Sequence, residues 1–171
     1  MAYTDDSPVA QPQGWRTVAA LNSYVERGAE TALREAAGIS LVEYTLLDVM
    51  NRQSGRHHLR MSQVARATAL SESATTRLVD RLESRGMLAR YLCADDRRGI
   101  YAELTPAGMT TLERCQSPYA HAITDALSHA ASMPEFATAV NALQPVLSGH
   151  DGEENTTTPE TSSTPNKERH S

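Results

Sequence analysis

Near the middle of the chain, the spacing of apolar residues changes from the period of a helix to the period of a strand. Helical spacing relates Leu78, Val79 and Leu82 within the run "LSESATTRLVDRLESRGML". Apolar residues then alternate with others in residues 88–92 and 100–104, and the polar run "CADDRRG" lies between these two segments. Two alternating segments joined by a polar loop that closes on glycine predict a β-hairpin directly after a helix.

Short helices are predicted ahead of the hairpin. The run "SLVE" is a capping box, because Ser40 caps the helix that follows and the side chain of Glu43 reaches back to it; this helix runs to about Arg52. The run "MSQVARATAL" predicts a second short helix at residues 61–70. The next helix, which leads into the hairpin, is capped by Ser71.

Longer helices are predicted on either side of this region. An apolar stripe predicts a long first helix that Gly38 ends. In "TPAG", Thr105 caps a second long helix and a proline occupies its first position. A last helix follows it. The stripes of these three helices consist of Trp15, Val18, Leu21, Val25, Ala29, Ala32 and Ala36; of Leu112, Cys115, Tyr119, Ala122, Ile123, Ala126 and Ala130; and of Phe136, Val140, Leu143 and Leu147.

The distribution of charge favours a polyanionic partner more than the net charge does. The whole chain carries a formal charge of −5, but residues 52–98 contain ten arginines and five acidic residues, which makes this window +5. The window contains no lysine, and the planar guanidinium suits phosphates and base edges better than an ammonium does. A local basic field in an acidic protein is typical of a confined nucleic-acid site. A solvated basic surface is the alternative at this point.

Several classes of protein are excluded or disfavoured by the sequence. No run of 18 or more apolar residues exists, so we expect no membrane span, and the polar, acidic start does not resemble a secretory signal. The two cysteines, Cys93 and Cys115, are too few for a disulfide scaffold, and a cytoplasmic location is expected. No paired catalytic residues, glycine-rich phosphate loop or metal signature is present, so we expect neither an enzyme nor a cofactor.

Two short helices followed by a hairpin predict a winged helix-turn-helix in a mainly α-helical fold. In that fold the helix capped by Ser71, which directly precedes the hairpin, enters the major groove of double-stranded DNA. Its first turns, "SESATTR", carry small hydroxyl side chains that allow close approach and bond phosphates or base edges. Helix capping explains Ser71 equally well. The residues predicted to contact DNA from the two helices are Ser62, Ser71, Ser73, Thr75, Thr76, Arg77 and Arg81.

The run "RMSQVARATALSESATTRLVDRLESRGMLARYLCADDRRGIYAELTPAG", residues 60–108, resembles the MarR family of bacterial transcription regulators. The resemblance lies in the ordered set of "RLVDRLE", "RGML", "DDRR" and "LTPAG" at these spacings. It implies a homodimer in which the terminal helices of two chains interlace above two winged domains. Long, alanine-rich amphipathic helices with few partners in their own chain are consistent with such a dimer.

The resemblance also implies the domain boundaries of the chain. Residues 14–39 and 106–148 are the expected dimerisation helices, and residues 40–105 are the expected winged helix-turn-helix domain. Residues 1–13 are polar, and residues 149–171 are rich in Ser, Thr, Glu and Pro, so both ends are predicted to be disordered.

The resemblance gives the acidic and basic residues of the hairpin loop a role. In the family, an acid in the wing pairs with the arginine two residues further on, and these positions are Asp96 and Arg98 here. The carboxylate would orient the guanidinium before binding and so lower the entropy cost. Arg98 is then expected in the minor groove, and Arg97 is expected on a phosphate.

The favoured interpretation is a dimeric repressor that binds a pseudo-palindromic operator and responds to a small aromatic or phenolic effector. Between the winged domain and the dimerisation helices, the residues predicted to line an effector pocket are Trp15, Tyr44, Met50 and His57. Core burial explains each of these four equally well.

Three alternatives keep the same fold. Cys93 or Cys115 could sense oxidants, although two structural thiols explain them as well. His121, Asp125 and His129 share a helical face and could hold a metal, although a solvated face is far more common. An architectural DNA binder without an effector is the third alternative.

Overall fold

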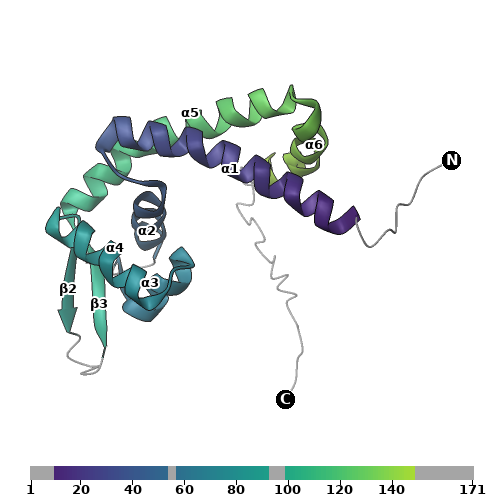
Figure 1. Ribbon diagram of the computed structural model, residues 1–171. Coiled ribbons are helices and arrows are strands. Elements are labelled where there is room, and N and C mark those ends of the chain that lie inside the picture. The colour runs from purple at the N-terminus through teal and green to yellow at the C-terminus, as the bar shows by residue number, and fades with distance from the viewer. Residues whose placement is uncertain (1–9, 54–56, 93–98, 149–171) are drawn as a thin grey trace, which may run out of the picture.

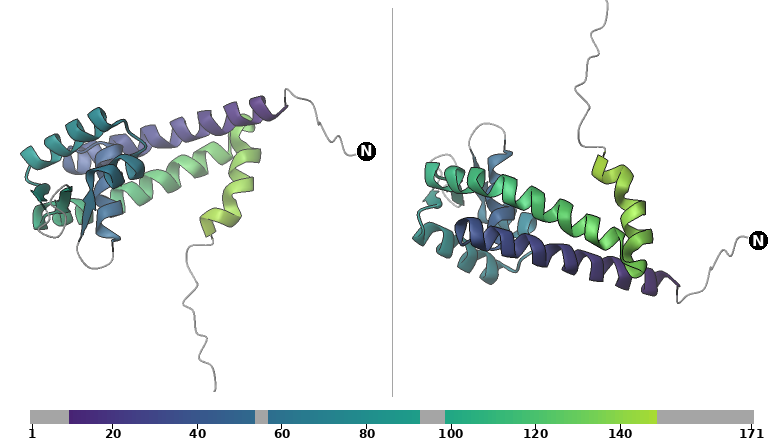
Figure 2. Two further views of the ribbon diagram at one scale, coloured as in Figure 1. Left: turned by 90° about the horizontal axis from the view of Figure 1, so that it is seen from below. Right: turned by 90° about the horizontal axis from the view of Figure 1, so that it is seen from above.

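The computed structural model describes residues 10–53, 57–92 and 99–148 of the 171-residue chain. It is mainly helical with one small antiparallel sheet, which confirms the predicted fold class. Two long helices, α1 (Ala10–Ala37) and α5 (Pro106–Ala131), lie side by side along the molecule (Figures 1 and 2). Helix α6 (Pro134–Ser148) packs against one end of this pair, and the remaining elements gather at the other end.

The elements at that other end form the winged helix-turn-helix. In chain order they are α2 (Leu41–Asn51), β1 (His58–Arg60), α3 (Met61–Thr68), α4 (Glu72–Ser84), β2 (Leu88–Leu92) and β3 (Ile100–Leu104). The predicted hairpin is confirmed, with Leu88 opposite Leu104 and Leu92 opposite Ile100. Strand β1 was not predicted; it pairs with β3 and completes a sheet of order β1-β3-β2. Three residues are too few to display a period of two.

The predicted caps set the boundaries of the helices. The capping box at α2 is present, since the backbone N–H of Ser40 donates to Glu43 Oε2 at 2.7 Å and the N–H of Glu43 donates to Ser40 Oγ at 3.3 Å. Thr105 caps α5, with Pro106 at its first position. Helix α1 begins at Ala10, so residues 10–13 are helical where the sequence predicted disorder. The rest of the two termini lies outside the described residues.

The hydrophobic core lies where the winged domain meets the two long helices. The central buried side chains are Leu33, Ile39, Leu46, Leu47, Met50, Val64, Leu78, Val79, Leu82, Leu88, Leu104, Leu112 and Cys115. They come from α1, α2, α3, α4, both hairpin strands and α5, so the winged domain shares one core with the long helices. A smaller cluster of Leu21, Ala130 and Val140, with Tyr24 and Phe136 beside it, joins α6 to the far end of the pair.

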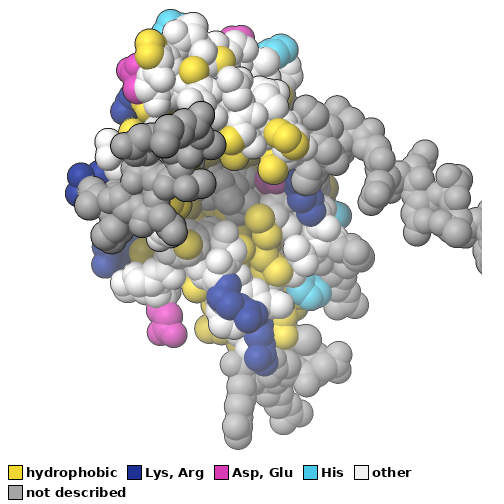
Figure 3. Space-filling model, turned by 90° about the vertical axis from the view of Figure 1, so that its right-hand side faces the viewer, with side chains coloured by type: hydrophobic (Ala, Val, Ile, Leu, Met, Phe, Trp, Pro, Cys, Tyr) yellow, Lys and Arg dark blue, Asp and Glu magenta, His cyan; other side chains and the backbone are white. Residues whose placement is uncertain are grey.

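The apolar stripe predicted for the first helix is only partly buried. Leu21 and Ala29 are buried as expected, and so is Leu33, which the stripe did not include. Trp15 and Val18, by contrast, are exposed within the chain. Hydrophobic side chains also lie at the surface, among polar ones, on the face shown in Figure 3. Within the described residues, no helix is both long and apolar enough to cross a membrane.

A close contact fixes helix α5 to the base of the hairpin. Gly108 lies directly against the carbonyl oxygen of Met87. A Cβ at position 108 would lie too close to that oxygen, so only glycine fits without a shift of the backbone. The hydroxyl of Thr105 donates to the carbonyl oxygen of Gly86 at 2.7 Å and accepts the N–H of Gly108 at 3.1 Å. These contacts join the start of α5 to the residues that precede β2.

Candidate nucleic-acid interface

Helices α3 and α4 form the helix-turn-helix, with Ala69 in the left-handed conformation at φ 53° between them. Helix α4 turns one face to the core through Thr75, Leu78, Val79 and Leu82. Its opposite face is exposed, and the predicted contact residues there are Ser73, Thr76, Arg77 and Arg81. Ser62, in the first turn of α3, is exposed as well.

The N-terminus of α4 combines helix capping with exposure. Ser71 Oγ accepts the N–H of Ala74 at 3.4 Å and lies 3.3 Å from Ser73 Oγ. Both serines are exposed, so capping leaves their outer surfaces accessible. The positive end of the helix dipole and the free N–H groups of the first turn favour an anion at this position.

Thr75 requires a correction. Its side chain is 1% exposed, and its hydroxyl donates to the carbonyl oxygen of Ser71 at 2.9 Å. Thr75 therefore packs into the core and supports the first turn of α4 rather than pointing outward. Its neighbour Thr76 is exposed, although its hydroxyl donates to the carbonyl oxygen of Glu72 at 3.0 Å. Thr75 lies three and four residues before Leu78 and Val79, so the helical spacing of the core residues already places it on the inward face.

The two arginines of the exposed face differ in their surroundings. Arg77 is exposed, and it makes no hydrogen bond or ion pair with the described part of the chain. Arg81 is half exposed, and its Nε lies 2.7 Å from Oε1 of Glu43 on α2. Arg77 is therefore a cation available to a ligand, whereas Arg81 already has one carboxylate partner.

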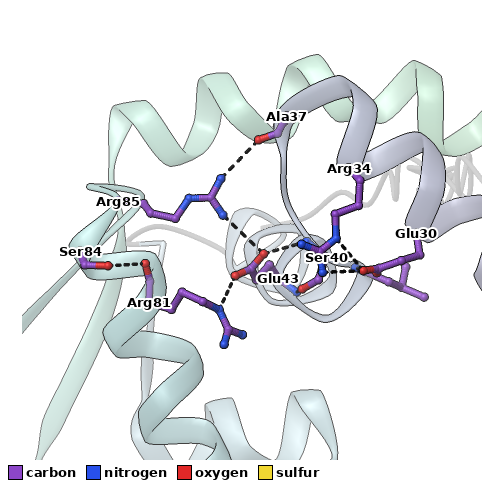
Figure 4. A network of polar contacts seen from close by, with 9 residues as sticks. Glu30, Arg34, Ala37, Ser40, Glu43, Arg81, Ser84 and Arg85 are labelled. Atoms are coloured by element: carbon purple, nitrogen blue, oxygen red, sulfur yellow. Dashed lines mark hydrogen bonds and ion pairs between the residues drawn. The ribbon is translucent and has the colours of Figure 1, made fainter.

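Glu43 is the centre of a polar network between α2 and α4 (Figure 4). It is 2% exposed and accepts hydrogen bonds from Ser40 and Arg81, and Arg85 Nη1 lies 3.5 Å from its Oε2. Burial by itself would raise the pKa of Glu43. The hydrogen bonds from Ser40 and Arg81 and the charge of Arg81 outweigh burial and hold the pKa below its ordinary value.

The sequence did not predict this network. The capping box assigned Glu43 a local role at the start of α2, and nothing in the spacing of residues relates that position to a helix 38 residues further on. The sequence offers no signal that Glu43 is buried, because glutamate is usually exposed.

A second set of ion pairs fastens the hairpin to α4. Arg90 on β2 pairs with Asp80, and its Nη1 lies 3.2 Å from Oε2 of Glu83. Its backbone N–H also donates to Glu83 at 3.2 Å. Because both acids are on α4, these ion pairs connect the base of the wing to the exposed helix. The predicted wing residues Asp96, Arg97 and Arg98 lie outside the described residues, as does Cys93.

A cavity of about 320 Å³ opens between α3, α4 and the base of the wing. Met61, Ser62, Ala65, Thr76, Arg90 and Ile100 are among the residues that line it. A larger open groove, of about 740 Å³, separates α1 from α2 and the turn after α3, and Glu26, Leu41, Thr45 and Ala69 lie along it. The residues predicted for an effector pocket line neither of these two spaces.

The predicted pocket residues are not brought together in the chain. Trp15 is 70% exposed near the start of α1, whereas Met50 is fully buried in the core and His57 precedes β1. Tyr44 packs on Tyr119, with ring centroids 4.5 Å apart, and burial raises its pKa to about 12. Tyr44 and Met50 thus have packing roles in the single chain, as core burial alone would predict.

The thiol and metal alternatives gain no support from the described residues. Cys115 is buried, and burial raises the pKa of its thiol, which lowers the thiolate fraction that reacts with oxidants. His129 stacks on Tyr24, with ring centroids 6.2 Å apart. In the described ranges, no three His, Cys, Asp or Glu side chains lie close enough together to hold a metal ion.

Comparison with known proteins gives consistent results. The model described as the MarR family matches residues 37–99. Sco3205, a MarR family transcriptional regulator from Streptomyces coelicolor solved in complex with DNA, is 26% identical with a TM-score of 0.65, over 89% of this chain and 94% of that chain. Wild-type apo MarR from E. coli is 21% identical with a TM-score of 0.63, over 77% of this chain and 94% of that chain. The transcriptional regulator BldR from Sulfolobus solfataricus is 21% identical with a TM-score of 0.64, over 87% of this chain and 99% of that chain.

No curated protein sequence gives a significant match. The likeness to MarR and BldR, at 21% identity, concerns the fold alone. That fold includes the long helices as well as the winged domain, because each alignment covers more than three quarters of this chain. Residues 37–99 thus match the MarR family, and the fold of the chain resembles that of Sco3205, a MarR family transcriptional regulator.

Proposed function

We propose that this protein is a sequence-specific, DNA-binding transcriptional regulator. The observation that carries the proposal is the exposed face of α4, where Ser73, Thr76 and Arg77 lie together next to a capped helix N-terminus. A helix of this kind fits the major groove, where the edges of all four base pairs are distinguishable. The solved complex of Sco3205 with DNA supports this assignment.

We further propose that two copies bind a pseudo-palindromic operator, with half-sites about one helical turn apart. Ser62, Ser71 and Arg81 would contact the phosphates around the base-reading residues. In the wing, Asp96 would orient Arg98 into the minor groove, and Arg97 would contact phosphate. Occupation of an operator by such a dimer would block transcription, so the expected mode of action is repression.

The dimer is proposed to release DNA when a small aromatic or phenolic compound binds. Such an effector acts only if it binds the released state more tightly than the DNA-bound state. The spaces beside Arg90 and along α1 have volumes that suit small ligands. Tyr44 and Met50 are already buried in the single chain and Trp15 is exposed, so the pocket proposed from Trp15, Tyr44, Met50 and His57 would need a second copy to bring a Trp15 side chain to it. Operator release during a titration with phenols tests this proposal, and loss of a peroxide response in Cys115→Ser would instead favour the redox alternative.

The central test is selection of bound duplexes from the genome, followed by equilibrium binding of the wild type and Arg77→Ala. We expect one pseudo-palindromic sequence to be enriched. Arg77→Ala should weaken binding to it by about 1–3 kcal/mol and relax the base preference near the centre of each half-site. Enrichment of no sequence, together with equal affinity for unrelated duplexes, would favour the architectural alternative. Failure to bind any duplex at low salt would refute the proposed function.

A further inference from the structure

The ion pair between Glu43 and Arg81 joins a buried carboxylate to an exposed helix face. The side chain of Glu43 is 3% exposed, while that of Arg81 is 54% exposed. The contact is made by the Nε of Arg81, 2.7 Å from Oε1 of Glu43. The carboxylate therefore holds the inner edge of the guanidinium and leaves its outer end in solvent.

The outer end of Arg81 points away from Glu43 and is free to bind. Figure 4 shows the two terminal nitrogens of Arg81 directed away from the carboxylate. Arg81 follows Arg77 by four residues on α4, so both side chains leave the same face of the helix. The terminal nitrogens carry four N–H donors, which is the geometry that binds two oxygens of a phosphate.

We infer that Glu43 is a positioning residue for DNA binding, which holds Arg81 by its Nε so that the terminal nitrogens face a phosphate of the duplex beside α4. The inference rests on the proposed function and goes beyond it, because Glu43 would never touch DNA. A long, free arginine loses rotamer freedom when it binds. The buried carboxylate removes much of that loss in advance.

The position of Glu43 is itself fixed by three helices. Its Oε2 accepts the N–H of Ser40 at the start of α2. Arg85, near the end of α4, reaches the same carboxylate and also donates from Nη2 to the carbonyl oxygen of Ala37 at 3.3 Å. Glu30 of α1 accepts the N–H of Leu41. The anchor of Arg81 is therefore tied to both the long helix α1 and the start of α2.

Charge and orientation predict effects of opposite sign. A carboxylate near a DNA backbone repels phosphate, so removing its charge alone would tighten binding. If Glu43 orients Arg81, removing the same charge weakens binding. The sign of the change in DNA affinity therefore separates repulsion from orientation. If Glu43 has a purely structural role, its replacement would lower thermal stability, and the loss of DNA affinity would be the same whether or not Arg81 is present.

The experiment compares the affinities of wild type, Glu43→Gln, Arg81→Ala and the double variant for the duplex that the wild type selects. Glutamine keeps the hydrogen bond of the capping box, which also accepts Gln at this position. We expect Glu43→Gln to weaken binding about two- to tenfold with an almost unchanged salt dependence. Arg81→Ala should weaken it further and lower the salt slope by about one. The double variant should bind no more weakly than Arg81→Ala.

Two further variants sharpen the test. Asp48→Asn removes one charge from the same helix α2, where Asp48 pairs with Arg52 at 2.9 Å, and we expect it not to weaken binding. Arg81→Lys keeps the wild-type carboxylate and the positive charge. The single ammonium of the lysine would lie on Glu43, so binding should fall nearly as far as in Arg81→Ala. This variant tests the inference even if Glu43→Gln does not fold.

Several outcomes would overturn the inference. Tighter or unchanged binding by folded Glu43→Gln would show that the carboxylate does not orient Arg81. Equal weakening by Glu43→Gln in the wild-type and Arg81→Ala backgrounds would show that its effect does not pass through Arg81. Full affinity in Arg81→Lys would show that the guanidinium fork is not used. Absence of DNA binding by the wild type would instead refute the proposed function, and the inference with it.

Discussion

At the scale of single residues, Ala69 carries the clearest local strain. It has a φ of 53°, and it is the one residue other than glycine with a positive φ in the described ranges. The left-handed conformation costs a non-glycine residue about 1–2 kcal/mol, because Cβ approaches the following carbonyl oxygen. The turn between α3 and α4 nevertheless requires this conformation at its first residue.

Replacing this residue should stabilise the protein. Ala69→Gly removes the steric cost but increases the conformational entropy of the unfolded chain, which costs about 0.4–1 kcal/mol. We therefore expect a net gain of roughly 0.5–1 kcal/mol in the free energy of unfolding. Urea unfolding, followed by circular dichroism, measures it. Gly38→Ala is the matched control, because Gly38 has a φ of 66° and the substitution should have the opposite sign. A lower unfolding midpoint for Ala69→Gly would contradict this account.

At the scale of the elements, the ion pairs of Glu43 connect α2 with α4 and make this connection dependent on pH. The folded pKa of Glu43 lies below its ordinary value of 4.5. A carboxyl whose pKa is lowered by folding contributes stability above its unfolded pKa, and that contribution disappears as the pH falls through the folded pKa. The contact between the two helices is therefore expected to weaken under acid conditions.

The corresponding prediction compares the wild type with Glu43→Gln, in which this group cannot titrate. At neutral pH the wild type should be the more stable of the two. As the pH is lowered below about 4.5, the difference in the free energy of unfolding should shrink, because Glu43 becomes protonated and resembles glutamine. Thermal unfolding of both proteins at a series of pH values measures the difference, in which the other carboxyl groups largely cancel. A difference that stays constant down to the lowest pH would contradict the assigned pKa shift.

The elements also mark the limit of what the sequence could predict. The capping box at Ser40, the cap at Thr105 and the hairpin are local features whose partners lie within a few residues or across one short loop, and all were predicted correctly. The pairing of Glu43 with Arg81 depends on tertiary packing across 38 residues, which no local pattern records. The inward position of Thr75, by contrast, follows from the helical spacing of Leu78, Val79 and Leu82, and the prediction that it contacts DNA disregarded that spacing.

At the scale of the whole molecule, large apolar side chains are exposed on α1 and α6. The large exposed apolar residues of the long and terminal helices are Trp15, Val18, Leu143, Val146 and Leu147. They lie on the first half of α1 and on α6, which meet at the end of the molecule away from the wing (Figure 2). Four of these residues, Trp15, Val18, Leu143 and Leu147, belong to the apolar stripes predicted from the sequence. They are exposed in the single chain, so packing within one chain does not explain why these positions are apolar. A second copy covering these surfaces would explain why the stripe extends beyond the intrachain core.

The final prediction concerns the proposed dimer. In a two-fold symmetric interface, one substitution removes the same side chain from both copies. Burial of a large apolar side chain contributes about 1.5–3 kcal/mol for each copy. Trp15→Glu and Val146→Glu should therefore each raise the dimer dissociation constant by roughly two to four orders of magnitude. Light scattering and sedimentation measure this change. The monomers should also lose most of their affinity for the two-half-site duplex, because one winged domain can contact only one half-site.

Leu92→Glu is the matched control for this prediction. Leu92 is 70% exposed, as Trp15 is, but it lies on the hairpin at the other end of the molecule. The Leu92→Glu variant should keep the mass of the wild-type dimer, because residue 92 is far from the proposed interface. A wild-type protein that sediments as a monomer at micromolar concentration would refute the dimer. Equal dissociation by Leu92→Glu and Trp15→Glu would move the interface to the winged end, where two copies would compete with DNA for the same surface.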